Sequence, residues 1–369
     1  MNVGYLISTL ERTGPTNVLY DLVSGLDRTR FNPVIVTLSP EPPRSRLADF
    51  KELGIDVHTL NMGRMQGLLQ GAVKVKRALD EARVDILHSH GLRADMMAGS
   101  LAGGQATCST VHAVLSEDYR LGYGKYKGAL VSFMHGRALK KIGKPVGCSS
   151  AVFSFLKNAL ELPNAACVKN GVSTDRFRPD SEARNALRSS LGIAPDECVW
   201  IATGALIPRK DPGWLIDAWA SAYGNADKMR LLVLGNGPLM EACARKAKPY
   251  ENIKLMGNVD KVSEFLSASD IFVSCSEAEG LPLAVLEAVA SGLRCLISDI
   301  EPHLEIADNA PLGISTFELG SSQSFKEAAG EVQAVAASSS VALRDYVCTE
   351  FSATAMAKQY EGIYQRLQK

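Results

Sequence analysis

The amino-acid sequence predicts an α/β protein with two doubly wound parallel sheets, one in each half of the chain. Short apolar runs of strand length alternate with longer amphipathic segments from the first residues to beyond Leu312. This rhythm is typical of parallel sheets covered by helices. The alternation is interrupted once, by a charged, turn-prone stretch, and continues after it, which indicates two consecutive domains. A chain of 369 residues is long enough to give each its own core.

The first half of the chain contains the strands and helices of the first expected domain. Strands are predicted at Val3–Ser8, Val34–Leu38, Val57–Leu60, Ile86–Ser89, Cys108–Val111, Val146–Cys148 and Cys167–Lys169. Helices are predicted between them, among others at Thr16–Leu26, Leu69–Ala82 and Tyr126–Lys141. The hinge is expected in residues 172–197, where Pro179 and Pro195 interrupt regular structure.

The second half repeats the pattern and ends in a helix. Strands are predicted at Trp200–Thr203, Leu231–Leu234, Ile253–Leu255, Ile271–Val273 and Cys295–Ser298. We therefore expect domains at residues 1–172 and 173–351, followed by an amphipathic helix at 352–369 that packs back on the N-terminal domain. Doubly wound sheets bind ligands at the carboxyl ends of their strands, so the active site is expected in a cleft between the two domains.

Composition and charge narrow the functional class. Forty Lys and Arg residues balance forty Asp and Glu residues, which argues against nucleic-acid binding. The eight cysteines include no C-x-x-C pair and are expected to be free thiols in a reducing compartment. The first residues lack a basic n-region and a cleavage site, and no uncharged apolar run reaches the ~18 residues of a transmembrane helix. A cytoplasmic location is expected.

Residues 274–292, SCSEAEGLPLAVLEAVASG, contain the densest group of candidate site residues. The segment follows an apolar strand and ends where Gly292 can cap a helix, with Pro282 expected in the first helical turn. Glu279 then falls in the strand-to-helix loop and Glu287 on the second turn of the helix. The alternative is that Glu287 is a solvated helix residue and Glu279 only favours the helix start.

The N-terminus of this expected helix is a candidate anion site. Its donors are the backbone N–H groups of Gly280, Leu281 and Leu283. Together with the positive end of the helix dipole, they are suited to bind a phosphate.

The stretch EGLPLAVLEAVASG resembles the EG-x-P/G-x5-EA-x-A-x-G signature of the retaining glycosyltransferases of family 4. Further segments resemble the family in order along nearly the whole chain. They are Asn170-Gly171-Val172 with Asp175 and Phe177, Ala202–Pro212, Leu234–Leu239 and Leu255–Val259. Ser173 stands where the family usually has Asp. The resemblance implies the GT-B fold, with two Rossmann-like domains facing a central cleft.

The resemblance also implies how a nucleotide-sugar donor would be held at its reacting end. Arg209 and Lys210 would bind the pyrophosphate, and a cationic pair suits a leaving diphosphate that gains negative charge. Glu279 would position the donor sugar and stabilise positive charge near its anomeric carbon. The alternative for Arg209 and Lys210 is a solvated pair in a strand-to-helix loop.

The nucleoside end of the donor is assigned in the same way. By resemblance, the backbone of Asn258 and Val259 would contact the nucleobase, and Glu287 would bind the ribose hydroxyls. Gly235 and Gly237 follow a predicted strand and would form a wall of the cleft, although glycines there also permit a tight turn.

The first half contains two candidate site residues, Gly14 and His112, and a pair of histidines that could be mistaken for a metal site. Gly14 follows the first strand and could let backbone amides approach a phosphate or the acceptor, while Pro15 equally supports a structural role. His112, at the end of a strand, would contact the donor sugar by resemblance, with a hydrogen-bonded core histidine as the alternative. His88 and His90 do not predict a metal site, because no third ligand stands nearby.

Tyr123–Lys144 combines six basic residues with apolar side chains at helical spacing. A basic amphipathic helix can lie on an anionic membrane, which predicts peripheral membrane contact. The alternative is a helix packed on the core with a solvated basic face.

We therefore expect a retaining glycosyltransferase that moves a sugar from a UDP- or GDP-sugar to a hydroxyl of a saccharide or lipid-linked saccharide. The family resemblance implies front-face attack. No cofactor is expected, and a divalent metal is unnecessary where a cationic pair and a helix N-terminus can hold the leaving diphosphate. The family's usual work and the basic helix indicate cell-surface polysaccharide or lipopolysaccharide synthesis at the inner face of the cell membrane. The alternatives are a non-catalytic nucleotide-sugar-binding subunit and a sugar-nucleotide epimerase or phosphorylase of the same fold.

Overall fold

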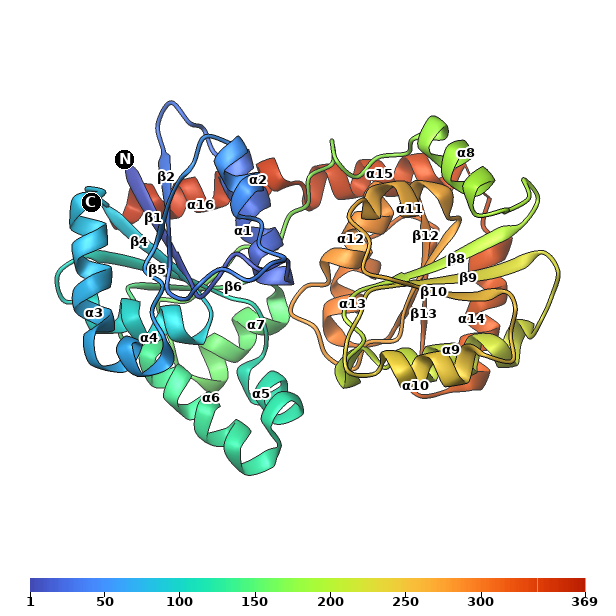
Figure 1. The fold of residues 1–369 in the computed structure, drawn as a ribbon, viewed down its shortest axis with the longest axis horizontal. Helices are drawn as coiled ribbons and strands as arrows, with labels where there is room; N and C mark the ends of the chain where they lie inside the picture. The colour runs from blue at the N-terminus through green and yellow to red at the C-terminus, as the bar shows by residue number, and fades with distance from the viewer. Residues whose placement is uncertain (337, 369) are drawn as a thin grey trace. The chain divides into compact units, whose positions relative to one another are not determined.

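The computed structural model describes residues 1–336 and 338–368, which divide into two compact units. Met1–Gly171 and the segment from Ala353 onward form the first unit, and Val172–Ser352 form the second. Each unit has one parallel sheet with helices on both faces (Figure 1). The prediction of two Rossmann-like parallel-sheet domains is thus confirmed. Lys369, where the expected C-terminal helix ends, lies outside the described residues.

The first unit is built on a seven-stranded sheet in the order β3-β2-β1-β4-β5-β6-β7. Its strands are β1 (Asn2–Ile7), β2 (Asn32–Thr37), β3 (Asp56–Thr59), β4 (Ile86–His90), β5 (Ala106–Val111), β6 (Lys144–Gly147) and β7 (Ala166–Cys167). The strand order reverses between the neighbours β1 and β4, so the topological switch point lies at their carboxyl ends.

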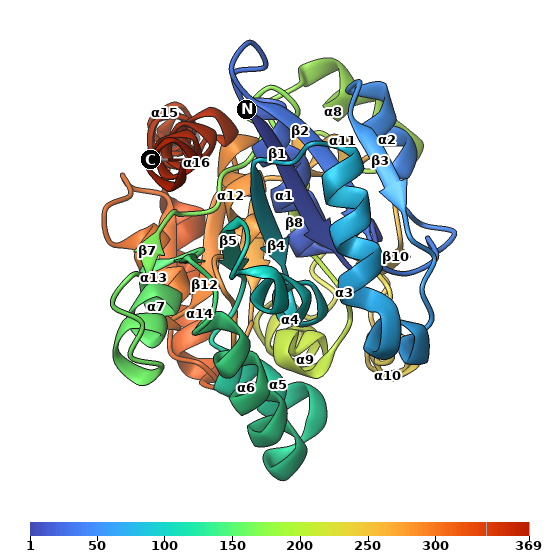
Figure 2. The ribbon, with the colours of Figure 1, turned by 90° about the vertical axis from the view of Figure 1, so that its left-hand side faces the viewer.

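Helices cover both faces of this sheet. They are α1 (Gly14–Gly25), α2 (Leu47–Glu52), α3 (Arg64–Glu81), α4 (Leu92–Leu101), α5 (Leu115–Tyr123), α6 (Lys125–Leu139), α7 (Ser150–Ser154), the π-turn η1 (Phe155–Ala159) and α16 (Ala353–Leu367). α1 and α16 pack side by side. Figure 2 shows α5 and α6 as a helical hairpin that is directed away from the sheet.

The helix α16 supplies part of the core of the first unit. Tyr360 and Tyr364 are fully buried. The Tyr364 hydroxyl lies 3.0 Å from that of Tyr5 and 2.8 Å from Nδ1 of His88. The Tyr360 hydroxyl lies 2.6 Å from Oγ1 of Thr110. Side chains from β1, β4 and β5 thus depend on α16 for their hydrogen-bond partners.

The second unit has a six-stranded sheet in the order β10-β9-β8-β11-β12-β13. Its strands are β8 (Cys198–Thr203), β9 (Met229–Leu234), β10 (Ile253–Gly257), β11 (Ile271–Ser274), β12 (Arg294–Ser298) and β13 (Ile314–Phe317). The switch point here lies between β8 and β11, which pair directly.

The helices of the second unit also occupy both faces of its sheet. They are α8 (Ser181–Ser190), the 3-10 turn η2 (Pro208–Lys210), α9 (Pro212–Tyr223), α10 (Met240–Ala247), α11 (Val262–Ala268), α12 (Leu283–Ala290), α13 (Glu301–Ala307), α14 (Ser322–Ala334) and α15 (Ser339–Glu350). Figure 1 shows α9, α10 and α14 on one face and α11 and α12 on the other.

α8 and β13 are among the elements that were not predicted from the sequence. The stretch expected to be the hinge contains α8, whose N-cap Asp180 accepts a hydrogen bond from Ala183 N at 2.9 Å. α8 is tied to the sheet by Arg184 and Arg188, which both reach Asp270, at 2.7 and 3.3 Å. β13 pairs with β12 and completes the edge of the second sheet.

No helix in the described part of the chain is long and apolar enough to cross a membrane. All eight cysteines are free, and five of them are buried.

Candidate active site

The candidate active site lies at the switch point of the second unit, where the loops after β8 and β11 meet. The loop after β8 carries Arg209 and Lys210 in η2, and the loop after β11 carries Glu279. The two loops are joined by a backbone hydrogen bond from Glu277 N to the Arg209 carbonyl at 2.7 Å. Gly204, Lys210 and Ser276 are among the residues that line a small cavity at this edge. In such sheets, ligands usually bind in the crevice at the switch point, beside the loops that follow the two strands.

Three of the residues singled out from the sequence are in direct contact here. Nζ of Lys210 lies 2.7 Å from Oε1 of Glu279, and Nη1 of Arg209 lies 3.1 Å from Oε2. Arg209 also donates to the Ala278 carbonyl at 2.9 Å. Ser276 donates to Oε1 of Glu279 at 2.8 Å. The carboxylate therefore offsets one of the two positive charges and is itself held by three donors.

The electrostatic balance keeps Glu279 ionised. Its side chain is only 8% exposed. Burial by itself would raise its pKa, but the charges of Lys210 and Arg209 outweigh burial and lower the pKa to about 2. Glu279 is consequently a weak base at neutral pH, suited to stabilising positive charge rather than to exchanging a proton.

The turn that positions the cationic pair has a local cause in the sequence. Pro208 opens η2 and Pro212 opens α9, so both elements begin with a residue already fixed near helical φ. Asp211 between them has a left-handed φ of 37° and, as N-cap of α9, accepts from Trp214 N at 3.1 Å. This sharp turn separates η2 from α9 and leaves Arg209 and Lys210 in the loop.

Gly235 has a structural reason to be glycine. Its φ is 127°, and an added Cβ would overlap the carbonyl oxygen of Gly204. An added Cβ at Gly237 would likewise overlap the Leu206 carbonyl. The loop after β9 thus packs directly on the loop that carries Arg209 and Lys210.

The remaining candidates of the second unit lie along α12 and beyond β10. Glu287 is buried on the second turn of α12. Gly280 and Leu281 are buried in the preceding loop, and Leu283 is the first residue of the helix. Pro282 is the N-cap, with an extended ψ of 103°, and does not belong to the first turn as expected.

Asn258 is exposed and Val259 half-buried in the turn after β10. The turn follows an irregularity in the pairing of β10 with β9, between Leu255 and Gly257. The structure thus leaves these two residues at the carboxyl end of the edge strand.

A buried network behind Glu279 was missed in the sequence analysis. Ser298 donates to the Ser276 carbonyl at 2.7 Å. Nδ1 of the fully buried His303 lies 2.9 Å from the Ser298 carbonyl. Burial lowers the pKa of His303 to about 4, so the ring is neutral. Ser276 could have been noticed from its place in the motif, whereas nothing in the sequence marks Ser298 or His303.

The candidates of the first unit lie at the carboxyl edge of its own sheet. Gly14 is the exposed first residue of α1, and an added Cβ there would meet nothing within 4 Å. His112 directly follows β5, and its Nε2 lies 3.0 Å from Nδ1 of His90. Within the described residues, no group of three or more His, Cys, Asp or Glu side chains is arranged to hold a metal ion.

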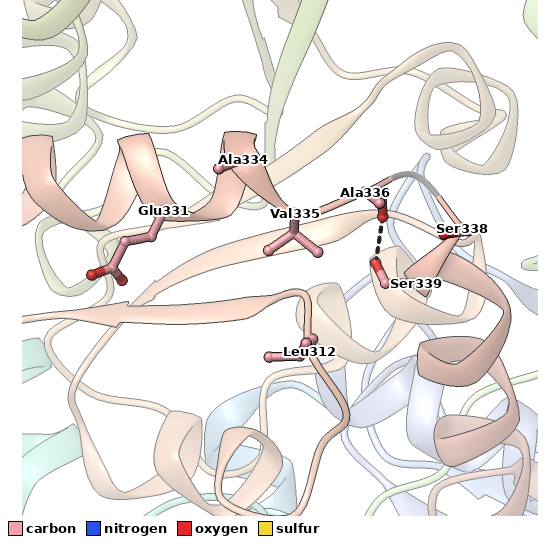
Figure 3. A pocket seen from close by; sticks show the side chains of 7 residues that line it. All are labelled: Leu312, Glu331, Ala334, Val335, Ala336, Ser338 and Ser339. Atoms are coloured by element: carbon pink, nitrogen blue, oxygen red, sulfur yellow. Dashed lines mark hydrogen bonds between the residues drawn. The ribbon is translucent and has the colours of Figure 1, made fainter.

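A larger cavity of about 520 Å³ lies elsewhere, between the end of α14 and the start of α15 (Figure 3). Glu331 is the one charged residue among the described residues that line it, and the Ser339 hydroxyl donates to the Ala336 carbonyl at 2.9 Å. The cavity therefore lacks the converging polar groups of the Glu279 site.

Two family models match the chain. The model described as "Glycosyltransferase Family 4" matches residues 12–176, and the model described as "Glycosyl transferases group 1" matches residues 197–334. The first match covers most of the first unit and continues to residue 176 in the second, and the second match lies within the second unit.

Two curated relatives are named for their donor and acceptor. The chain is 24% identical over 248 residues to the UDP-Gal:alpha-D-GlcNAc-diphosphoundecaprenol alpha-1,3-galactosyltransferase of Escherichia coli, covering 63% of this chain and 62% of that protein. It is 31% identical over 135 residues to the GDP-mannose-dependent alpha-(1-6)-phosphatidylinositol monomannoside mannosyltransferase of Mycobacterium tuberculosis, covering 33% of this chain and 35% of that protein. The chain thus spans less than two thirds of the length of either relative.

Solved structures match over nearly the whole chain at low identity. HepE of Anabaena, in complex with UDP and glucose, has a TM-score of 0.82 at 16% identity and covers 99% of this chain and 100% of its own. Sucrose-phosphate synthase of Thermosynechococcus elongatus has a TM-score of 0.83 at 16% identity and covers 100% and 99%. These likenesses establish the GT-B fold.

The contact between Lys210 and Glu279 makes a stability prediction. Lys210→Met should lower the free energy of unfolding by about 1–3 kcal/mol, because it leaves a buried carboxylate with one partner fewer. Adding Glu279→Gln should recover part of the loss. The pair stabilises the fold fully above the ordinary carboxyl pKa of 4.5, and its contribution is lost as pH falls towards 2.

Urea denaturation of the two single variants and the double variant at pH 7 measures this coupling. Lys228→Met is the control, because its ion pair with Asp196 is largely exposed and should matter little. Strictly additive losses for Lys210 and Glu279 would contradict the coupling.

Proposed function

The chain belongs to the family 4 and group 1 glycosyltransferases, and we propose that it moves a sugar from a nucleotide-sugar donor to a hydroxyl of a saccharide or lipid-linked saccharide acceptor. The observation that carries this proposal is the convergence of Arg209 and Lys210 on Glu279 at the β8–β11 switch point. The names of the relatives, which act with UDP-galactose and GDP-mannose, support a UDP- or GDP-sugar as donor.

In the proposed reaction the donor diphosphate takes a place beside Arg209 and Lys210. The leaving diphosphate gains negative charge as the glycosidic bond breaks, and the two cations with the N-terminus of α12 stabilise that charge. On this scheme the reaction needs no divalent metal, since these groups supply the positive field. In the structure Arg209 and Lys210 both donate hydrogen bonds to the Glu279 carboxylate. Donor binding therefore has to replace part of these hydrogen bonds with contacts to the diphosphate.

Glu279 then acts on the sugar as a fixed negative charge. A carboxylate whose pKa is about 2 and which accepts from Lys210 and Ser276 is poorly suited to act as a nucleophile or a base. It is well suited to stabilise the positive charge that develops at the anomeric carbon. This supports front-face attack with retention, in which a donor phosphate oxygen accepts the proton of the acceptor hydroxyl.

The other assigned residues complete the donor site of this proposal. Glu287 binds the ribose hydroxyls, and the backbone of Asn258 and Val259 contacts the nucleobase. In the first unit Gly14 leaves room for a phosphate or the acceptor.

A lipid-linked acceptor would bring the protein to the cytoplasmic face of the membrane, and we propose that the α5–α6 hairpin docks there. Of the nine large apolar side chains exposed in the described residues, five lie on this hairpin. They are Tyr123, Tyr126, Leu130, Phe133 and Met134. Lys125, Lys127 and Arg137 are exposed beside them, as an anionic surface requires. The acceptors in the names of both relatives are lipid-linked, which supports this setting.

The site makes a prediction for catalysis. Arg209→Ala and Lys210→Ala should each lower kcat/KM for transfer by one to three decades, because each removes a charge from the leaving diphosphate. Nucleotide sugars are first screened by thermal shift to find the donor, since a bound donor raises Tm. Lys228→Ala is the control, because Lys228 directly precedes β9 and lies at the amino-terminal end of that strand. Unchanged kcat/KM in both site variants would refute the clamp, and release of an epimer or a sugar 1-phosphate without acceptor would favour the alternative reactions.

The two glutamates should differ in their kinetics. Glu279→Gln should lower kcat more than donor affinity, because the Glu279 carboxylate faces the reacting sugar. Loss of its negative charge also leaves Arg209 and Lys210 available to the nucleotide. Glu287→Ala should chiefly weaken nucleotide binding. Steady-state kinetics and calorimetry with the nucleoside diphosphate separate the two, and Glu251→Gln, exposed before β10, is the control. The reverse pattern would exchange the two roles.

Membrane docking predicts salt-sensitive flotation with liposomes. Binding should require anionic lipid, fall at high salt and drop when Lys125, Lys127, Lys140 and Lys141 become Glu, since near-surface basic residues contribute about 1 kcal/mol each. The control reverses four exposed lysines elsewhere on the first unit: Lys51, Lys76, Lys157 and Lys358. Flotation that does not change with lipid charge, with salt or with the reversal of Lys125, Lys127, Lys140 and Lys141 would refute the docking.

A further inference from the structure

Three histidine rings form a stack at the carboxyl edge of the first sheet. His88 and His90 lie on β4, and His112 follows the neighbouring strand β5. The ring centroids of His88 and His90 are 4.5 Å apart, and those of His90 and His112 are 5.3 Å apart. His90 is therefore the middle ring, and it is 2% exposed.

The hydrogen bonds of the stack allow only two proton arrangements between His90 and His112. Nδ1 of His90 lies 3.0 Å from Nε2 of His112, and one proton lies between two neutral rings. If His112 donates that proton, His90 must carry its own proton on Nε2. If His90 donates it, Nε2 of His90 has a lone pair and His112 must carry its proton on Nδ1.

The surroundings of Nε2 of His90 decide between the two arrangements. This atom is buried and has no hydrogen-bond partner among the residues that the structure describes. A buried N–H without an acceptor loses a strong interaction with water and is rarer in proteins than a buried acceptor left unused. The arrangement that leaves only a lone pair at this position is therefore favoured, because its unpaired N–H then lies on His112, which is half-buried, and not on the buried His90.

We propose that His90 donates its Nδ1 proton to Nε2 of His112 and thereby holds His112 as the Nδ1–H tautomer, a neutral hydrogen-bond donor to an oxygen of the donor sugar. His90 is thus a positioning residue for His112. The contact with the sugar rests on the proposed function, whereas the tautomer rests on the geometry of the first unit alone.

The neighbouring groups leave both rings neutral. Burial and the adjacent histidines hold the pKa of His90 well below its ordinary value, and loss of water lowers the pKa of His112 to about 4. The nearby carboxylate of Asp95 is occupied by Ser89, Ser109 and His135.

His88 does not alter the assignment. Its Nδ1 lies 2.8 Å from the Tyr364 hydroxyl and its Nε2 lies 2.8 Å from Oγ1 of Thr110. Both of its nitrogens are thus engaged, and it takes no part in the proton shared by His90 and His112.

The tautomer has a chemical consequence for His112. Its lone pair on Nε2 is engaged by His90, so the ring cannot accept a proton from an acceptor hydroxyl. In the described part of the chain Nδ1 of His112 has no hydrogen-bond partner, which leaves that N–H available to a ligand oxygen. His112 accordingly stabilises the bound sugar without acting as a general base.

The tautomer is tested by long-range ¹H–¹⁵N NMR of the histidine rings in the ligand-free protein, with His112→Gln to assign the signals. We expect His112 to show a protonated Nδ1 and an unprotonated Nε2. His90→Leu should release the ring towards the Nε2–H form. His90→Asn should preserve the Nδ1–H form, because the Asn amide nitrogen falls near the position of Nδ1. An Nε2–H His112 in the unaltered protein would overturn the proposal whether or not His90→Leu folds.

The positioning role is tested by transfer kinetics on the same variants. His90→Leu should lower kcat/KM by about tenfold, the loss expected for one neutral hydrogen bond, and His90→Asn should restore most of it. A changed tautomer with unchanged kcat/KM would overturn the positioning role. If the unaltered protein has the Nδ1–H tautomer and transfers no sugar from any donor, the proposed function fails while the tautomer assignment stands.

Discussion

A buried carboxylate that must remain charged is the constraint around which the second unit is arranged. Glu279 can be ionised at 8% exposure only because Lys210 and Arg209 reach it from a different strand-to-helix loop. That reach requires the left-handed turn at Asp211, and the loop that makes it is supported from behind by Gly235 and Gly237. The glycines, the prolines of η2 and α9, and the serine network therefore all serve one electrostatic arrangement.

The two units solve the problem of burying titratable groups in opposite ways. In the second unit opposite charges compensate one another, so the carboxylate stays ionised. In the first unit the histidines stack on one another and lose their charge, since burial disfavours the protonated ring and, for His88 and His90, a neighbouring histidine lowers the pKa further. The carboxyl edge of the second sheet thus carries fixed charges, whereas that of the first sheet carries neutral histidine rings, which have only dipoles.

Sequence patterns predicted the elements that local periodicity determines. They did not predict the elements and contacts that depend on residues far away in the sequence. Apolar runs located the strands because buried parallel strands are apolar on both faces, and the sequence placed Glu279 in a loop and Glu287 on the second turn of a helix, where the structure has them. α8 was missed because its helix is polar and is held by Arg184 and Arg188 on Asp270, some eighty residues away. The link from His303 through Ser298 to Ser276 leaves no local trace for the same reason. The hydrogen bond between His90 and His112 joins two strands, and only the sheet register brings the two rings together.

The position of α16 in the chain sets an order of assembly during translation. The strands β1, β4 and β5 leave the ribosome early, but the hydroxyls of Tyr360 and Tyr364 that satisfy Tyr5, His88 and Thr110 are synthesised only after the whole second unit. Until then the face that α16 covers is open, and these polar groups lack their partners in the folded protein. Its completion therefore follows that of the second unit, although its strands come first.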